Sequence, residues 1–184
     1  MYCKYFCEIL KSLTIGVIIC SMNIEWKNIG DNESVLINTW LSSQDKHNLC
    51  MTKKSWKQTA IDIDDCLKNM DNAQFKNIMG FIFGKPAVAV MFGIEQGEIL
   101  NLYNIVVNPA CRNMGVATKV ISQLLNHDNS LRIEKSYKKV VVSALPDNIT
   151  VHNLLKTMGF NNLGFNGEYV VFEKDLVKID EKTL

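Results

Sequence analysis

A chain of 184 residues, 47% of them apolar, is long enough to form one domain around a full hydrophobic core. Twenty basic and nineteen acidic residues leave a net charge of +1 without a basic stripe, so we expect no nucleic-acid partner. The six cysteines form no Cys-x-x-Cys pair and no close cluster with the three histidines, which argues against a metal site. Unpaired thiols are typical of a reducing compartment, and we expect a cytoplasmic protein.

The first 22 residues stand apart from the rest of the chain. Leu13 to Cys20 is apolar, but it is far shorter than the ~20 residues of a membrane-spanning helix. Lys4 and Lys11 precede it as in a signal peptide, yet no small-x-small cleavage site follows, so stable membrane insertion is not predicted. We interpret this segment as an extension ahead of a natural start at Met22 or as an added N-terminal helix, with membrane anchoring as a third, weaker reading.

The domain is expected to begin with a short strand and a helix. Asn23 to Trp26 has strand character, and Asp31 or Asn32 is expected to cap the helix that follows. The helix has one apolar face, formed by Leu36, Ile37, Trp40 and Leu41.

A second helix is expected to start after Ser55, which can cap it. Its apolar residues recur at steps of four and three, the spacing of a helix packed on a core: Trp56, Ala60, Ile63, Leu67 and Met70. Asp62 and Asp65 lie off this stripe, either as a solvated face or as carboxylates that attract a cationic acceptor.

Three strands are predicted to follow as a meander, at Phe75–Phe83, Ala87–Ile94 and Ile99–Val107, with turn residues between them. The C-terminal part is predicted to add a buried strand, a short helix and a closing hairpin: Lys139–Leu145, Asn148–Phe160, and Asn161–Phe165 with Glu168–Glu173. Because no linker divides this stretch, residues 23–175 are predicted to form one domain, and 176–184 a polar tail.

A strand, a tight turn and a helix meet in the middle of the chain. Ile105 to Val107 has strand chemistry, and Pro109 stops the strand. The helix that follows has apolar residues at helical spacing: Val116, Val120, Ile121, Leu124 and Leu125. The turn reads Arg112-x-x-Gly115-x-Ala117, whose small residues let the backbone pass close to a ligand at the positive end of the helix. The pattern favours a diphosphate site.

This stretch resembles motif A of the GNAT superfamily, the acyl-CoA-dependent N-acyltransferases. The motif Val-x-Pro-x-x-(Arg/Gln)-x-x-Gly-x-(Gly/Ala) is filled by Val107, Pro109, Arg112, Gly115 and Ala117. The family's later motif, Asn-x-x-Ala-x-x-Leu-Tyr-x-x-x-Gly-Phe, is matched at its spacing by Asn148, Leu154, Gly159 and Phe160. Two positions depart from it, because Val151 stands for the usual Ala and Leu155 for the usual Tyr.

The resemblance implies an α/β (α+β) fold with a central mixed, mostly antiparallel sheet of six to seven strands flanked by about four helices. It also implies acetyl-CoA as acyl donor. The backbone N–H groups of the turn would hold its diphosphate, at Asn113, Met114, Gly115, Val116, Ala117 and Thr118, and the backbone of Ile105, Val106 and Val107 would pair with its pantetheine arm. For Arg112, phosphate contact and pairing with a surface carboxylate stay open; for Asn148, a bond to the cofactor arm and a helix N-cap stay open.

The resemblance leaves the catalytic groups unknown. Leu155 cannot protonate the departing thiolate as the family's Tyr does, and the two usual base positions correspond to Asn101 and Ser143, which could only position a water. Tyr103 and Tyr169 are the nearest phenols, each a candidate catalytic group or a core or rim aromatic. Two further candidates have plain alternatives: His152 as a base or a surface histidine, and Cys111 as a reactive or an inert thiol.

We therefore predict an N-acetyltransferase in which a primary amine attacks acetyl-CoA directly. The acceptor is open between a small-molecule amine and a protein N-terminus, and the protein is expected to be a monomer or a homodimer. A non-catalytic acyl-CoA-binding sensor or regulatory module is the alternative.

Overall fold

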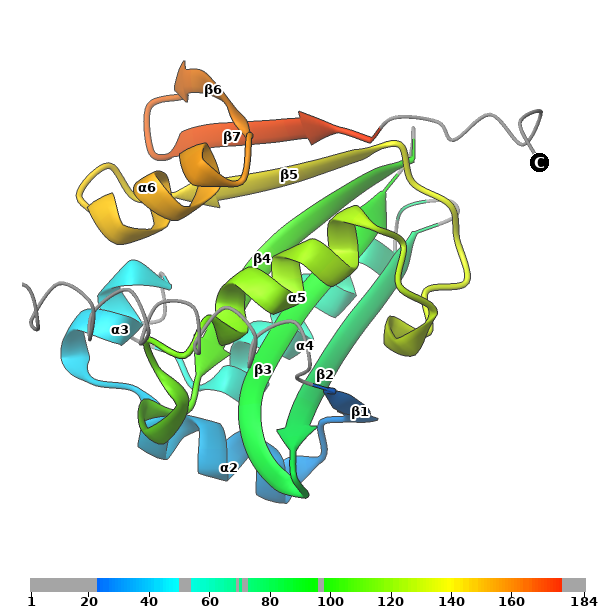
Figure 1. Ribbon diagram of the computed structural model, residues 1–184, viewed down its shortest axis with the longest axis vertical. Helices are drawn as coiled ribbons and strands as arrows, with labels where there is room; N and C mark the ends of the chain where they lie inside the picture. Colours follow the sequence, from blue (N-terminus) through cyan, green and yellow to red (C-terminus); the bar gives the residue numbers. More distant parts are fainter. Residues whose placement is uncertain (1–22, 50–53, 69, 71–72, 96–97, 177–184) are drawn as a thin grey trace, which may run out of the picture.

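The structure is a computed structural model that describes residues 23–49, 54–68, 70, 73–95 and 98–176 (Figure 1). The segment 1–22 and nearly all of the predicted polar tail lie outside the described residues. Within the described ranges, no helix is both long enough and apolar enough to cross a membrane.

A seven-stranded sheet in the order β1-β2-β3-β4-β5-β7-β6 forms the centre of the fold. Neighbouring strands are antiparallel except β4 and β5, which are parallel. The predicted mixed, mostly antiparallel sheet is confirmed. Its strands are β1 (Glu25–Asn28), β2 (Gln74–Ile82), β3 (Lys85–Glu95), β4 (Ile99–Val107), β5 (Lys139–Ala144), β6 (Asn161–Phe165) and β7 (Val170–Asp175).

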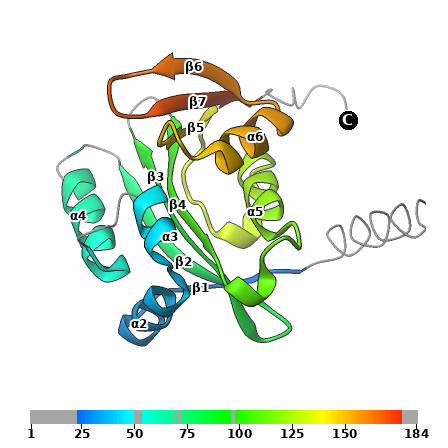
Figure 2. The ribbon, with the colours of Figure 1, turned by 90° about the vertical axis from the view of Figure 1, so that its left-hand side faces the viewer.

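Helices cover both faces of the sheet (Figure 2). One face carries α2 and α4, whose Trp40, Trp56 and Ala60 pack on β2, β3 and β4 in one buried cluster. On the other face α5 and α6 pack through Val120, Leu124 and Leu155 in a second cluster. The helices are α2 (Asp31–Trp40), α3 (Ser43–Asn48), α4 (Trp56–Lys68), α5 (Val116–Leu125) and α6 (Ile149–Thr157), with short 3-10 turns at Pro109–Cys111 and Asn129–Leu131.

Helix α3 was not predicted. Its six residues, SQDKHN, include no apolar side chain, so they carry no periodic signal. Polar caps form the helix instead: the Ser42 hydroxyl accepts from the Asp45 amide at 3.1 Å, and the Asp45 carboxylate accepts from the Ser42 amide at 2.8 Å.

Several predicted boundaries shift by a few residues. The first strand begins at Glu25 rather than Asn23, and α2 is capped by Gly30, whose N–H donates to Glu33 at 3.1 Å, rather than by Asp31 or Asn32. Met70 lies beyond the end of α4 and is partly exposed. Strand β7 begins at Val170 instead of Glu168 because the Asn166 side chain accepts the N–H groups of the next residues and extends the turn.

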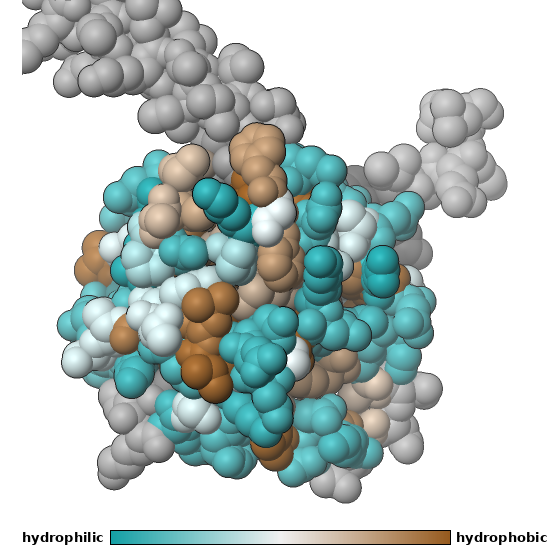
Figure 3. Space-filling view, turned by 90° about the horizontal axis from the view of Figure 1, so that it is seen from below, coloured by the Kyte–Doolittle hydropathy of each residue, from teal (hydrophilic) through white to brown (hydrophobic). Residues whose placement is uncertain are grey.

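Exposed apolar side chains lie in small groups among hydrophilic ones on the face seen in Figure 3. Small exposed apolar groups of this kind are an ordinary property of protein surfaces.

Candidate active site

A β-bulge sets the course of β4 through the site. Met91 pairs with Asn104 and Phe92 with Leu102, so Tyr103 is the extra residue on β4. Without the bulge, the residue that follows Leu102 on the α5 face would be Asn104. The extra residue moves Ile105 and Val107 to that face, where both pack against the cluster under α5.

Strands β4 and β5 separate at this bulge. Their pairing runs from Ile99–Lys139 to Leu102–Val142, and from Tyr103 on, in the part of the chain that the structure describes, β4 pairs with β3 only. Figure 1 shows the two strands spreading apart toward α6 and the turn before α5. The second half of β4 therefore has one free backbone edge.

The direction of the backbone groups on this edge follows from one hydrogen bond. The Asn108 N–H donates to the Ala87 carbonyl on β3 at 2.8 Å. Because successive residues of a strand point to opposite sides, the N–H groups of Val107 and Ile105 face the gap. The Val107 carbonyl accepts from the Arg112 side chain at 3.2 Å, which leaves the Val107 N–H and the Ile105 backbone for a ligand.

The turn before α5 presents a second set of backbone donors. Gly115 has φ +75°, and Asn113 has φ +60°, both in the left-handed region. The first intrahelical bond runs from the Lys119 N–H to the Gly115 carbonyl at 2.9 Å, so the N–H groups of residues 116–118 have no acceptor within the helix. Together with the helix dipole they form an anion site, which fits a diphosphate.

Two neighbouring cavities connect these donors to the opposite face of the sheet. One, of about 450 Å³, lies along the turn, and the other, of about 490 Å³, passes through the gap between β4 and β5 to α4. They share lining residues from α3, β4, α5 and α6 and form one groove: Asn48, Leu49, Ile105, Val107, Ala117, Asn148 and Val151. All the predicted turn residues except Met114 line one or both cavities.

The candidate catalytic residues meet in the second cavity. Asn101 and Tyr103 from β4, Ser143 from β5 and Tyr169 before β7 all line it, together with Leu155. His152 does not line it, since its Nε2 bonds the Leu145 carbonyl at 2.9 Å and its ring packs on Phe172. The structure does not support His152 as a base.

The ionisable groups around this cavity already have partners. The Tyr103 hydroxyl donates to Glu95 at 2.7 Å, and burial together with this carboxylate raises the pKa of Tyr103 well above its ordinary value. Asp62 accepts from Lys54 at 2.5 Å and from Gln58 at 2.8 Å, and these bonds lower the pKa of Asp62. Both groups are therefore poor bases at neutral pH.

Asn148 and Leu155 occupy the positions that the second motif predicts. Asn148 is the N-cap of α6, where its side chain accepts from the Val151 N–H, and it also lines both cavities, so the two roles left open for it are compatible. Leu155 is fully buried in the core under α6 and carries no proton for a leaving group.

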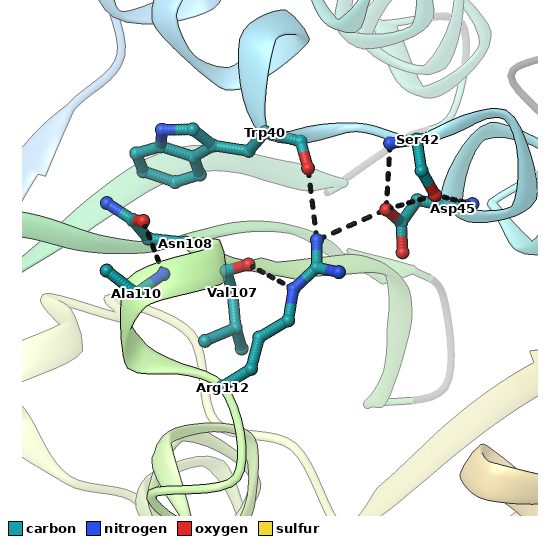
Figure 4. Close-up of polar contacts among 7 residues, drawn as sticks. All are labelled: Trp40, Ser42, Asp45, Val107, Asn108, Ala110 and Arg112. Carbon is teal, nitrogen blue, oxygen red and sulfur yellow. Dashed lines mark hydrogen bonds and ion pairs between the residues drawn. The ribbon is translucent and has the colours of Figure 1, made fainter.

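The Arg112 side chain bonds protein groups rather than the open turn (Figure 4). Its Nε donates to the Val107 carbonyl, and its Nη2 donates to the Trp40 carbonyl at 3.0 Å and to Asp45 at 3.1 Å. Burial alone would raise the pKa of Asp45, but the bonds from Ser42 and Arg112 outweigh it and hold that pKa below its ordinary value.

A group whose pKa is lowered on folding stabilises the fold above its unfolded pKa, here 3.8, and loses this effect as the pH falls through its folded pKa. We therefore expect Asp45→Asn to lower the urea midpoint by a constant amount between about pH 5 and 8 and by less below about pH 4. A difference that instead changed between pH 5 and 8 would contradict this assignment.

The fold and the groove together define the class of protein. The model of the acetyltransferase (GNAT) family matches residues 45–160, and the chain belongs to this family. The family uses acetyl-CoA, and membership implies an acyltransferase. The search of curated proteins found no match to the sequence.

Solved structures agree on the fold. The ribosomal-protein-S18-alanine N-acetyltransferase from Escherichia coli is 12% identical, with a TM-score of 0.57 over 88% of this chain and 99% of that one. The GNAT domain of S. lividans PAT is 14% identical, with a TM-score of 0.62 over 84% of this chain and 90% of that one. The yncA protein of Salmonella typhimurium, a putative acetyltransferase solved with its cofactor acetyl-CoA, is 12% identical. Its TM-score is 0.56 over 85% of this chain and 95% of that one. Identities this low establish the fold alone.

Sequence reasoning missed part of the site. Asn48 and Leu49 at the end of α3 line both cavities, and Lys54, Thr59 and Ile63 line the second. The one local signal for α3 was the Ser42-x-x-Asp45 capping pattern.

Proposed function

We propose that the protein is an N-acetyltransferase that transfers the acetyl group of acetyl-CoA to a primary amine by direct attack. The observation that carries the proposal is the single groove that joins the open N-terminus of α5, the free edge of β4 and the cavity under α4. A donor and an acceptor entering from opposite ends of this groove would meet where β4 and β5 converge.

The residues of the groove suit the donor. In this proposal the N–H groups from Asn113 to Thr118 hold the diphosphate, and the Val107 N–H and Ile105 backbone pair with the amides of the pantetheine arm. One of these strand N–H groups can also stabilise negative charge on the carbonyl oxygen, independently of any side chain. Arg112 is not needed as a phosphate ligand, since its side chain is bonded elsewhere.

The acceptor has to attack as a neutral amine. Asn101 and Ser143 cannot remove a proton near pH 7. Asp62 and the hydroxyls of Tyr103 and Tyr169 are bound by their partners. The described lining thus supports a mechanism in which the amine arrives neutral, and Asn101 or Ser143 holds a water that carries away the proton released on attack. Water protonates the departing thiolate, because Leu155 cannot.

We expect kcat/KM to rise about tenfold per pH unit up to the pKa of the acceptor itself and then to level off. For an α-amine, whose pKa is about 7.7–8.0, kcat/KM should thus level off more than two pH units lower than for a lysine amine, whose pKa is about 10.4. Initial rates with acceptors of both kinds, measured across this pH range, test the expectation. An inflection at one pH for every acceptor would instead reveal a base on the enzyme.

The function itself is tested with the full chain, acetyl-CoA and a mixed panel of amines, polyamines and N-terminal peptides, by following free thiol and the mass of the acetylated product. Thiol release that depends on one acceptor, with matching product, supports the proposal. Failure of CoA to bind would contradict the assignment of the groove.

One observation favours the second candidate, a non-catalytic acyl-CoA sensor. The usual acid and both usual base positions of the family are Leu155, Asn101 and Ser143, and all three line the cavity. A sensor would bind acetyl-CoA tightly and leave it intact across the whole panel.

A further inference from the structure

Helix α3 lies across the groove and reaches the core only through the residues that flank it, Leu41 and Leu49. None of its residues is buried, yet Asn48 at its end and Leu49 just after it form part of the wall of both cavities. Figure 2 shows α3 on the front of the molecule, between α4 on one side and α5 and α6 on the other. Between these two leucines, within the described part of the chain, the helix itself has only polar contacts to hold it over the groove.

An ion pair and a hydrogen bond supply those contacts, one on each side of the groove. Asp45 pairs with Arg112, which precedes the anion-binding turn, and His47 lies 3.0 Å from Asp147, which precedes α6. Asp45 also accepts from both the amide and the hydroxyl of Ser42, so the residue that holds Arg112 is also part of the capping box of α3.

Arg112 is committed to this arrangement by its other bonds. It donates to the Trp40 carbonyl at the C-terminal end of α2, where a helix leaves its last carbonyls without internal partners, and to the Val107 carbonyl at the end of β4. Turning the guanidinium toward a phosphate would remove the donors of both carbonyls and of Asp45 together. The side chain thus joins α2, α3 and β4 at one point (Figure 4).

We propose that Arg112 is a positioning residue: through Asp45 it fixes α3 as the shared wall of the cofactor and acceptor cavities, and it is not a ligand of the diphosphate. The inference rests on the proposed function, because it assigns the two cavities to donor and acceptor. The inference means that Arg112 affects the acceptor site. This site and the turn before α5 lie on opposite sides of α3.

The test compares Arg112→Gln, Asp45→Asn and the double variant with the wild type, all as full chains. Asn at 45 keeps an oxygen acceptor for Ser42, so the cap of α3 is preserved while the negative charge that pairs with Arg112 is removed. Asp31→Asn is the matched control, since it removes an exposed ion pair with Lys57, at 2.9 Å between α2 and α4, that has no part in the groove. Calorimetry with CoA measures cofactor affinity, and hydrogen exchange of residues 43–49 measures the anchoring of α3.

We expect both single variants to speed exchange in α3 by about three- to tenfold and to change the Kd for CoA by less than about threefold. The double variant should match Arg112→Gln, because Asp45 has already lost its partner there, and Asp31→Asn should match the wild type. Once an acceptor is known, its KM should rise in both variants while kcat changes little.

Two results would overturn the inference. If Arg112→Gln weakened CoA binding about tenfold or more while Asp45→Asn did not, Arg112 would be a phosphate ligand. If exchange in α3 were unchanged in both variants, the link would not hold the helix. Either result is distinct from failure of the proposed function, in which the wild type itself would not bind CoA.

Discussion

Gly115→Glu is expected to abolish CoA binding while the protein stays folded. Gly115 is the N-cap of α5 at φ +75°, a conformation that costs a residue with a side chain about 1–2 kcal/mol. The new carboxylate would stand beside the free N–H groups of residues 116–118 and occupy the proposed site of the diphosphate. Steric exclusion and like-charge repulsion together should raise the Kd for CoA about 100-fold or more, which corresponds to about 3 kcal/mol.

Gly84→Glu is the matched control. Gly84 has φ +71° in the turn between β2 and β3, and a Cβ placed on it would meet nothing within 4 Å. This variant carries the same backbone strain and the same added charge but leaves the groove untouched. Calorimetry with CoA and urea unfolding should show equal losses of stability for the two variants and a loss of binding for Gly115→Glu alone. Equal losses of binding would show that strain, not the site, is responsible.

Local patterns predicted the parts of the fold that are built from them. The bounds of β4 and β6 agree with the prediction because alternation, Pro109 and the Asn166-Gly167 turn all act within a few residues. The motif around Gly115 was found in the same way, since a turn, a strand and a helix start are adjacent in the chain. Ser55 is near the start of α4 as expected, where its hydroxyl accepts from the Gln58 N–H.

The other parts of the site depend on contacts between residues far apart in the sequence. Arg112 and Asp45 are 67 residues apart, so the turn alone could not decide between a phosphate ligand and an ion pair. The bulge at Tyr103 is a property of the register with β3. The bond from the Tyr103 hydroxyl to Glu95 also depends on a distant residue, Gly93 on β3. Gly93 leaves space for the Tyr103 ring, because a Cβ on this residue would lie 3.1 Å from the ring.

The four catalytic candidates illustrate the same limit. The positions of Asn101 and Tyr103 on β4 and of Ser143 on β5 are enough to predict that they share one cavity. Alternate residues of a strand point to the same face of the sheet. Their chemistry depends on partners from other elements, such as Glu95 on β3. Sequence therefore indicates where the reaction would occur more readily than it indicates which group would move a proton.

Trp56→Ala is expected to cost about 3–5 kcal/mol of the free energy of unfolding, the range for truncating a fully buried tryptophan. Trp56 is the first residue of α4 and packs against α2 and the sheet. Its amide N–H donates to the Asn38 side chain and its indole N–H donates to the Asn77 side chain, each at 3.0 Å. Urea denaturation followed by circular dichroism measures the loss.

Trp56→Phe separates packing from the hydrogen bond. It keeps most of the apolar volume and the backbone bond to Asn38 but leaves the Asn77 oxygen without its indole donor, which should cost about 1–3 kcal/mol. A Phe variant as unstable as the Ala variant would mean that the indole bond, not the buried surface, holds α4. Because α4 carries Thr59, Asp62 and Ile63 to the cavity proposed for the acceptor, loosening it should weaken acceptor binding before CoA binding, whose proposed donors lie on β4 and α5.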